Sequence, residues 1–490
     1  MVSEFRGNQM QAPDINAIRK MIEYYEEDNR NFKQQAEEGI AYYRNENKIL
    51  RTGAAAIDEV NAYLKKLGKN PLKSADNRIP TNWHRIFTDQ KTGYLFTYPP
   101  QFDTDSDSED TEIVDKIKEA LGDDYEKVIK QLGTDASNAG RAWLHYWYQK
   151  GEPFEYYFIN PLEIIPIYDN QNVKKPLKYL IRRYNFVDYT GTSKQRYELW
   201  DDKQVCYLER LSSKRDIEFE VLPNGQYNIE PHTYGEIPFI EFPNNDARLN
   251  DLQMYKGLID AVDKLISGFA NDIDDIQEII WVIRNYAGET METAYDKDGN
   301  EVQVDVDIRQ KLKARKYAMV DDKGGIDALR NEIPYEARGR FLDILTEQLY
   351  ISAMAVNPNP EQTGNATGTY IEFLYSLLEL KGGLMELEFR PALNQLIRAI
   401  LKYCGLSVDT KIEQKWTRNK PRNDLEISQI IAQTPSSVLS DETKTKEHPL
   451  VENWKTERER VEKQQEESRQ NMMDQWPIET PLNQKPGEEE

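Results

Sequence analysis

The sequence predicts an α+β protein in which a β-rich part lies between helical parts. Short runs of alternating apolar residues, rich in Tyr, Ile and Val, occupy residues 152–243 and predict antiparallel strands. Apolar residues spaced three and four apart over residues 251–285 predict a long amphipathic helix. The chain has 490 residues, so at roughly 150 residues per domain we expect about three domains.

Charge and composition exclude one class of protein and favour another. Lys and Arg number 63 against 85 Asp and Glu, which gives a net charge of −22. Because non-specific DNA affinity comes from Lys and Arg that neutralise phosphates, this excludes a protein that coats nucleic acid. A role with DNA therefore needs a local basic patch, or requires that DNA does not adhere. The hydrophobic fraction of 39% is lean for a compact monomer and favours an elongated shape or an assembly.

Cysteine content and hydropathy indicate the cellular compartment in which the protein is expected. Cys206 and Cys404 are the only cysteines, which excludes a disulfide framework and a zinc site built on cysteines. We therefore expect the protein to work in a reducing environment, such as the cytoplasm. No run approaches 18 apolar residues, so we expect no membrane-spanning helix, and the polar N-terminus predicts no signal peptide.

The N-terminal part is predicted to be mainly helical. Residues 14–67 are rich in helix formers, and Asp14 is placed to cap the first helix. Residues 77–98 alternate apolar and aromatic residues, which predicts either a helix or an extended segment packed on a core. Two further helices are expected over residues 111–132 and about 135–149.

The strands of the β-rich part are bounded by turn signals such as Pro223-Asn224-Gly225. The segment closes with a last alternating run at residues 237–242. The runs predicted as strands of an antiparallel sheet are residues 154–159, 163–168, 178–186, 196–200 and 204–211.

The long periodic segment is the clearest pattern in the chain. A helix over all of residues 251–285 would have about 35 residues and a length of roughly 50 Å at 1.5 Å per residue. Such a helix needs neighbours along its whole length. The apolar positions are Leu252, Tyr255, Ile259, Val262, Ile266, Phe269, Ile273, Ile276, Ile280 and Ile283.

The segments that follow alternate between short turns and helices. A hairpin is predicted around the turn at residues 296–300, and a second helix over residues 335–356. A helix-breaking loop with two prolines and two glycines occupies residues 357–368. A third long helix is predicted over residues 369–403, softened by Gly382-Gly383 and interrupted by Pro391.

The C-terminal part is predicted to be a short strand followed by charged helices. Residues 407–415 are strand-like, and residues 421–473 are helical with a highly charged end. The tail, residues 476–490, has three prolines and ends in three glutamates, which predicts disorder.

A search for catalytic motifs gives no positive signal. No phosphate-binding GxxxxGK[ST] loop, HExxH motif or GxSxG motif is present. His145 lies among Trp and Tyr residues, where a packed aromatic cluster is favoured over a ligand or base. A carboxylate-metal nuclease site has no sequence signature in a chain with 85 acids, so that alternative stays open.

The acidic segment at residues 101–115 has part of the pattern of a calcium-binding loop. Asp103, Asp105 and Asp107 have the spacing of a calcium loop, but Ser108 and Val114 stand where the turn glycine and the bidentate glutamate are needed. A solvated acidic loop is the favoured interpretation. No cofactor or metal is expected.

A basic cluster follows the predicted hairpin. It concentrates five bases within residues 309–316 and is the best candidate for contact with an acidic partner or with DNA. The alternative is a solvated helical face. The five bases are Arg309, Lys311, Lys313, Arg315 and Lys316.

In this order, the features resemble the portal (head–tail connector) proteins of long-tailed double-stranded DNA bacteriophages. The segment NRIPTNWHRIFTDQKTGYLFTYPP at residues 77–100 is similar to an early segment of the family, although Thr97 and Tyr98 stand where the family usually has glycine. The most specific likeness is at residues 237–286, which begin with IPFIEFPNN and continue with LIDAVDKLISGFAND. Further likenesses lie at residues 160–184, 365–381 and 440–463.

The resemblance implies a portal architecture with a β-rich wing, a long α-helical stem, a small α/β clip and a helical crown. It places these parts, in chain order, at residues 1–250 (wing), 251–280 (first stem helix), 281–334 (clip), 335–356 (second stem helix), 357–368 (tunnel loop), 369–420 (long helix and return to the wing), 421–475 (crown) and 476–490 (disordered tail).

The same resemblance implies a function without chemistry of its own. Family members form a ring, usually of twelve subunits, at one capsid vertex, where DNA is packaged by a separate terminase and later ejected. The implied partners are other copies of the chain, double-stranded DNA bound without sequence specificity, terminase, a head-completion adaptor, the scaffold and the major capsid protein. The implied location is the virion, and the host cytoplasm during assembly.

Three sets of site residues follow from the resemblance. The basic cluster would bind a partner at the clip. Stem packing would use Ile259, Val262, Ile266, Phe269, Ile273 and Ile276. The tunnel loop would present Asn357, Pro358, Asn359, Pro360, Gln362, Thr363, Gly364, Asn365, Thr367 and Gly368 to DNA. The alternatives are a carboxylate-metal nuclease or terminase-like packaging enzyme, and a scaffold of long helices without a channel.

Overall fold

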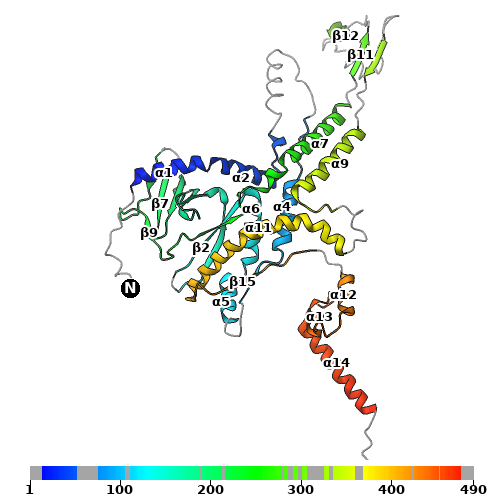
Figure 1. The fold of residues 1–490 in the computed structure, drawn as a ribbon. Helices are drawn as coiled ribbons and strands as arrows, with labels where there is room; N and C mark the ends of the chain where they lie inside the picture. The colour runs from blue at the N-terminus through cyan, green and yellow to red at the C-terminus, as the bar shows by residue number, and fades with distance from the viewer. Residues whose placement is uncertain are drawn as a thin grey trace, which may run out of the picture. The chain divides into compact units, whose positions relative to one another are not determined.

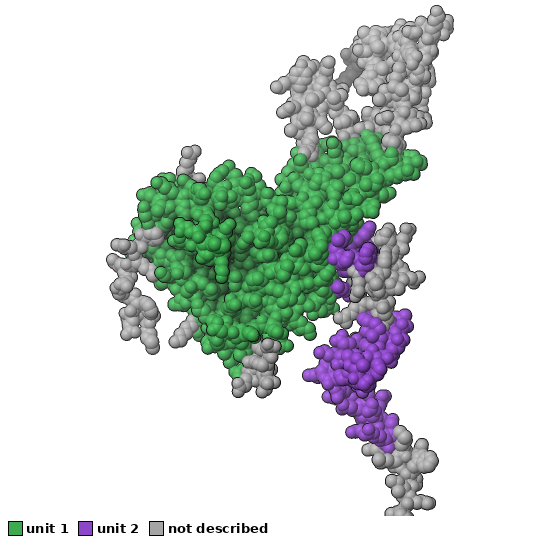
Figure 2. All heavy atoms as spheres, viewed as in Figure 1, with its two compact units in different colours: residues 1–355, 378–418 green, residues 356–377, 419–490 purple. Residues whose placement is uncertain are grey.

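The structure is a computed structural model. It describes residues 14–51, 76–104, 111–149, 151–187, 190–211, 216–276, 280–284, 291–295, 301–305, 325–329, 335–358, 368–420, 424–451 and 453–475. The chain forms two compact units, coloured separately in Figure 2. Unit 1 comprises Met1–Ala355 and Leu378–Arg418, and unit 2 comprises Val356–Leu377 and Asn419–Glu490.

The N-terminal helices of unit 1 begin where the capping residue predicts. The Asp14 carboxylate accepts a hydrogen bond from the backbone N–H of Asn16 at 3.0 Å, which satisfies a free donor of the first turn. The segment at residues 77–98, predicted to be either a helix or an extended segment, contains a helix. The N-terminal helices are α1 (Ile15–Asp28), α2 (Arg30–Tyr43), the short 3₁₀ helix η1 (Lys48–Leu50) and α4 (Trp83–Phe96).

A six-stranded antiparallel sheet fills the predicted β-rich part. Its order is β4-β5-β6-β7-β8, with β9 paired to β7. The first four occupy the alternating runs at residues 163–168, 178–186, 196–200 and 204–211. The strands are β4 (Ile164–Tyr168), β5 (Leu177–Val187), β6 (Ser193–Trp200), β7 (Gln204–Leu211), β8 (Glu218–Phe219) and β9 (Ile229–Pro231).

The two faces of this sheet bury different partners, because successive side chains of a strand point to opposite faces. Ile181 packs in one cluster with Ile18 and Ile22 of α1, so α1 covers that face (Figure 1). The neighbouring Leu180 packs in another cluster with Trp143 and Phe239. The second face is therefore covered by a three-stranded sheet of order β10-β2-β3, formed by β2 (Arg141–Trp147), β3 (Glu155–Ile159) and β10 (Phe239–Pro243).

Two predicted helices before this sheet are wrong in their bounds. The helix expected over residues 111–132 is broken at Gly122, which has φ +61°. The helix expected over about residues 135–149 is helical only as far as Ala139, and strand β2 follows it. Gly140, at φ +94°, ends the preceding helix in the left-handed conformation, and the aromatic residues after it favour a strand. The helices are α5 (Thr111–Leu121) and α6 (Tyr125–Ala139).

The acidic segment begins with a strand rather than a loop. Strand β1 (Gln101–Thr104) pairs antiparallel with β15 (Ile412–Lys415), which brings residues near 103 beside residues near 413. Residues 105–110 of the segment lie outside the described part of the chain. Strand β15 thus returns the chain to the N-terminal half of unit 1.

The long periodic segment is not one helix of 35 residues. It begins as the 3₁₀ helix η3 (Asp251–Met254), continues as α7 (Lys256–Ile276) and ends in strand β11 (Ile280–Arg284). Tyr255 separates the two helices with φ −140°. The run Ile280-Trp281-Val282-Ile283 is β-branched and aromatic, and it pairs with β14 (Gly325–Leu329) in an antiparallel ladder. Helix α7 is therefore shorter at both ends than the helix predicted over residues 251–285, and it lies inside residues 251–280, where the resemblance implies a stem helix.

The hairpin after this segment lies where the turn sequence predicts. Strand β12 (Met291–Tyr295) pairs with β13 (Glu301–Asp305), and Tyr295 is opposite Glu301. The basic cluster at residues 309–316 lies outside the described residues.

Two long helices follow in the chain. Helix α9 (Tyr335–Ala353) lies beside α7 (Figure 1). Helix α11 (Gly368–Tyr403) runs for 36 residues without interruption and contains Pro391 in its interior. The interruption predicted at Pro391 is therefore wrong. The residues around it, Phe389, Leu393 and Leu396, are buried, so packing holds the helix although proline removes one backbone hydrogen bond.

The C-terminal residues form separate helices in unit 2. Arg458 forms an ion pair of 2.8 Å with Glu442, which links the last two helices. The predicted disordered tail, residues 476–490, lies outside the described residues. The helices are α12 (Asp424–Gln433), α13 (Asp441–Glu447) and α14 (Trp454–Gln475). Across the described ranges, no helix combines the length and the apolar character needed to span a bilayer.

Candidate functional site

Helices α7 and α9 form a pair with its own apolar core. Ile259 and Val262 of α7 pack with Leu345 and Leu349 of α9, and all four side chains are buried. The same core includes Phe87 of α4. The positions that face the core are spaced three or four apart on each helix, as an amphipathic pair requires.

Buried polar contacts attach α7 to the N-terminal part of unit 1. Asp263 is fully buried, and its carboxylate accepts hydrogen bonds from the backbone N–H of Thr81 at 2.9 Å and from the Asn47 amide at 2.6 Å. Burial raises the pKa of Asp263, and these hydrogen bonds oppose that shift. The helix is therefore fixed in register as well as in position.

Helix α9 carries a second apolar face that the described part of the chain leaves uncovered. Phe341, Ile344 and Ile351 are 50%, 55% and 50% exposed, although Leu345 and Leu349 beside them are buried. Exposed apolar side chains at helical spacing are typical of a surface that packs against another chain. Ile273, near the end of α7, is also exposed.

A buried charge cluster lies where the α7–α9 pair meets the rest of unit 1. The Lys91 ammonium of α4 is 2.7 Å from the Asp251 carboxylate of η3, and the Lys381 ammonium of α11 is 3.2 Å from the same carboxylate. The Asn244 amide donates to Asp251 at 2.8 Å and accepts from Lys91 at 2.7 Å. The Asp251 carboxylate of η3 thus holds α4 through Lys91 and α11 through Lys381.

Two ammonium groups share one carboxylate in this cluster. Burial and these charges shift the pKa values of the groups in it. Burial lowers the pKa of Lys91 to about 8, against the attraction of Asp251. Burial lowers the pKa of the neighbouring His84 to about 4, so its ring is neutral and its Nδ1 lies 2.8 Å from the Tyr255 hydroxyl. Although burial alone would raise the pKa of Asp251, the two lysines hold it well below its ordinary value.

Lys381 also holds the end of α9. Its ammonium donates to the carbonyl of Ala353, the last residue of α9, at 2.9 Å. Met354 then has φ +51°, which ends the helix in the left-handed conformation. One side chain of α11 therefore fixes the end of α9, four residues before the predicted loop, and its own helix begins at Gly368, the last residue of that loop.

The predicted site residues fall into three groups in the structure. In the predicted stem stripe, Ile259 and Val262 are buried, Ile266 and Phe269 are half-buried, and Ile273 is exposed; the side chain of Ile276 is not described. In the predicted loop, Asn357 and Pro358 have no regular structure and Gly368 begins α11. The remaining loop residues and the five bases of the basic cluster lie outside the described part of the chain.

Sequence reasoning missed the charge cluster. Lys91, Asp251 and Lys381 are more than 100 residues apart in the chain, and nothing in the spacing of 63 bases and 85 acids singles them out. The one available signal was Asn250-Asp251 directly before a periodic segment, where a polar residue is expected to cap a helix. Asn250 does cap, since its side chain accepts from the Gln253 N–H at 3.2 Å.

The described residues give no arrangement that favours the nuclease alternative. Within these ranges, no group of three or more His, Cys, Asp or Glu side chains is placed to hold a metal ion. His145 stacks on Phe239 at 4.2 Å between ring centroids, and its Nδ1 lies 2.8 Å from the Pro238 carbonyl. Its aromatic surroundings are those of a packed side chain.

Comparison with known proteins gives a consistent result. A family model described as "Phage portal protein, SPP1 Gp6-like" matches residues 22–471. The portal protein of Clostridium phage phiCD119 is 35% identical over 436 residues, which cover 86% of this chain and 90% of that protein. The portal protein of Bacillus phage SPP1 is 27% identical over 474 residues, which cover 94% of this chain and 88% of that protein.

Solved structures give more distant likenesses. A chain of "Neck of native GTA particle computed with C12 symmetry" has a TM-score of 0.39 at 12% identity, covering 75% of this chain and 88% of that chain. A chain of "Neck of empty GTA particle computed with C6 symmetry" has a TM-score of 0.38 at 13% identity, covering 71% and 83%. The family match covers both helices of the α7–α9 pair, the charge cluster and the antiparallel sheets. This α+β chain belongs to the family of SPP1 Gp6-like phage portal proteins.

Proposed function

We propose that twelve copies of this chain form a closed ring at one capsid vertex, which serves as the channel for DNA packaging and ejection. Membership of the portal family supports the portal role. In this proposal the chain has no chemistry of its own, and a separate terminase supplies the energy for packaging. The protein acts in the virion, after assembly in the host cytoplasm.

The uncovered apolar face of α9 carries the proposal. Phe341, Ile344 and Ile351 are each about half exposed, and burying such surface against a neighbouring chain would stabilise an assembly by about 1 kcal/mol per side chain. A ring built from head-to-tail contacts uses two different patches of each subunit. The α9 face supplies one of them, and the exposed part of the α7 stripe at Ile273 lies on the same helix pair.

In this ring, the α7–α9 pair is the stem and the segment between α9 and α11 is the tunnel loop. Loop residues 357–368 carry one charged side chain, Glu361, among neutral polar groups. Neutral groups form replaceable hydrogen bonds with phosphates, whereas arginine would hold DNA through charge-assisted pairs. The hydrogen bond from the Lys381 ammonium to the Ala353 carbonyl holds the end of α9 that precedes this segment.

The basic cluster at residues 309–316 is proposed to bind partners. It would dock the acidic surface of terminase or of a head-completion adaptor, chiefly by speeding encounter. Reversing Lys311 and Lys313 to Glu should weaken that binding in a salt-dependent way. Unchanged adaptor and terminase binding at low salt would leave the cluster as a solvated face. The scaffold and the major capsid protein are the remaining proposed partners.

Assembly can be tested on the α9 face. Sedimentation velocity should give a ring-sized species for the natural chain and a smaller species for Ile344→Asp, because the substitution puts a charge into an apolar contact. Val173→Asp is the matched control, since Val173 is 99% exposed in a turn of the sheet. Rings that form equally well from Ile344→Asp and Val173→Asp would remove the α9 face from the interface.

A further inference from the structure

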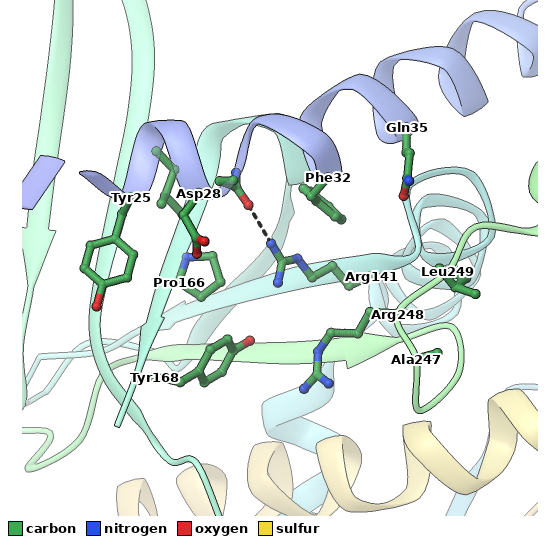
Figure 3. A pocket seen from close by; sticks show the side chains of 12 residues that line it. Tyr25, Asp28, Phe32, Gln35, Arg141, Pro166, Tyr168, Ala247, Arg248 and Leu249 are labelled. Atoms are coloured by element: carbon green, nitrogen blue, oxygen red, sulfur yellow. Dashed lines mark hydrogen bonds between the residues drawn. The ribbon is translucent and has the colours of Figure 1, made fainter. Parts of the chain in front are cut away.

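A cavity of about 300 Å³ lies in unit 1, away from the α7–α9 pair. Its walls come from four places: the junction of α1 and α2, the first residue of β2, strand β4 and residues 247–249. Figure 3 shows the guanidinium groups of Arg141 and Arg248 on one side of it, with the aromatic rings of Phe32 and Tyr168 nearby. Nothing in the portal role described above uses this cavity.

Arg141 is a buried cation whose charge is only partly balanced. The residue is 6% exposed, and its guanidinium lies over the Phe32 ring, 4.0 Å from the centroid. Its Nη2 donates to the amide oxygen of Asn29 at 3.0 Å, which is a neutral acceptor. Its Nε has no hydrogen-bond partner among the described residues. Burying a charge that is only partly neutralised is costly, so the site favours an additional anion.

The carboxylate nearest to Arg141 is already committed elsewhere. Glu241 lies 3.8 Å from the Nη1 of Arg141. Its two oxygens accept from Arg248 at 2.8 Å and 3.0 Å, a bidentate pair, and one of them also accepts from the Tyr168 hydroxyl at 2.8 Å. Bidentate pairs of this kind are the strong form of the contact. Two guanidinium groups therefore share one carboxylate beside the cavity.

The position of the remaining charged group in the lining sets the orientation of a ligand. Asp28 lines the cavity next to Tyr25 and Pro166 (Figure 3). Its carboxylate would repel an anion at that side and leave the Arg141 side favoured. Arg141 is positioned by β2, and Arg248 by the bidentate contact to Glu241, so the donors are held before a ligand arrives.

We propose that this cavity is an oxyanion-binding site, in which Arg141 and Arg248 hold a carboxylate or phosphate group between the Phe32 and Tyr168 rings. The ligand would add a second anionic group beside two guanidinium groups that share the single carboxylate of Glu241. The volume admits one small group, such as the end of an acidic side chain or a single phosphate.

The test is isothermal titration of the full chain with sodium glutarate and, separately, with inorganic phosphate, at an ionic strength held constant with sodium chloride. Saturable binding of either anion supports the site. Binding of glutarate alone identifies a carboxylate as its ligand, and binding of phosphate alone identifies a phosphate group. No saturable binding of either anion overturns the proposal.

Three variants separate this cavity from other anion sites. Asn29→Asp places a carboxylate on the Arg141 side, 3.0 Å away in the present geometry, and should abolish binding. Asn31→Asp adds the same charge two residues further on, in the first turn of α2, but Asn31 does not line the cavity, so binding should be unchanged. Asp28→Asn should tighten binding by about two- to fivefold, as expected for removal of one exposed like charge.

The variants also give the results that would contradict the site. Undiminished binding by Asn29→Asp, or equal loss in Asn29→Asp and Asn31→Asp, would place the anion elsewhere. Gln35→Glu, which puts a carboxylate on another wall of the cavity, gives an independent check if Asn29→Asp does not fold. Its binding should be weaker than that of the natural chain, and unchanged affinity would count against the proposal.

Discussion

The ammonium of Lys91 lies 2.7 Å from the carboxylate of Asp251, and these side chains are 1% and 4% exposed. The pair joins α4 to the start of the α7 segment, and Lys381 of α11 contacts the same carboxylate. A buried ion pair contributes little net stability, but loss of one partner leaves an uncompensated charge. The cluster therefore contributes more to fixing the position of α7 and α9 against α4 and α11 than to the stability of the fold.

Asp251→Asn should destabilise the chain strongly. The substitution leaves the ammonium groups of Lys91 and Lys381 buried without their carboxylate, which should lower the free energy of unfolding by about 3–5 kcal/mol. Denaturation by guanidinium chloride at a fixed protein concentration measures this. Asp202→Asn, at an exposed position, is the control and should change little. A similarly small effect of Asp251→Asn and Asp202→Asn would show that Asp251 does not pair with Lys91 and Lys381 in the folded chain.

The cluster also predicts a pH dependence. Burial lowers the pKa of Lys91 to about 8, whereas lysine in the unfolded chain titrates near pH 10.4. Between about pH 8 and pH 10.4 the unfolded chain holds a proton that the folded chain has lost. The free energy of unfolding should therefore rise with pH in that window, by up to about 1.4 kcal/mol per pH unit. Below about pH 8 this destabilising contribution is fully present.

Comparison with Lys91→Met isolates the contribution of Lys91 from the tyrosines that titrate at higher pH. From pH 7.5 to 9.5, the stability of the natural chain should rise relative to that of Lys91→Met. Denaturation midpoints at several pH values measure this difference. A difference that stays constant or falls over this range would show that Lys91 keeps its proton in the folded chain.

Gly140→Ala should cost more stability than placing alanine in the left-handed conformation costs by itself. Gly140 has φ +94°, and a Cβ there would lie 2.2 Å from the Arg248 carbonyl oxygen. Gly225, at φ +80°, has open space around it, so Gly225→Ala measures the backbone cost alone, about 1 kcal/mol. We expect the cost at Gly140 to exceed this by at least about 1 kcal/mol in thermal or chemical denaturation. Equal costs would mean that Arg248 moves freely.

The two faces of α9 should separate folding from assembly. Leu349 is fully buried, so Leu349→Ala should lower the free energy of unfolding by about 2–5 kcal/mol. Ile344 is 55% exposed, so Ile344→Ala should leave the fold intact and reduce the fraction of assembled chains. Circular dichroism with mass photometry gives both readouts. Loss of folding in Ile344→Ala with normal assembly in Leu349→Ala would contradict the assignment of the faces.

The sequence predicted the fold class and much of the local structure, because those follow from short-range patterns. Strands β4 to β7 occupy predicted runs, and the Asp14 cap is in place. The periodicity of residues 251–285 located a helix but not its ends. An apolar residue every three or four positions also fits a strand that is apolar on both faces, as at Ile280 and Ile283. Pattern alone therefore cannot mark where the helix stops.

The candidate sites were harder to predict because tertiary structure creates them. Lys91, Asp251 and Lys381 come together only once α4, η3 and α11 are packed. The oxyanion cavity likewise joins Arg141 to Asn29 across 112 residues of sequence. In the sequence, the apolar residues on the exposed face of α9 cannot be told from those on its buried face. Which of them the chain itself covers is decided only by the tertiary structure.

Electron microscopy of the purified, negatively stained protein tests the central claim most directly. The account predicts closed rings with a central channel along the symmetry axis, and their loss in Ile344→Asp but not in Val173→Asp. Single chains at every concentration, or compact particles without a channel, would contradict the proposed function.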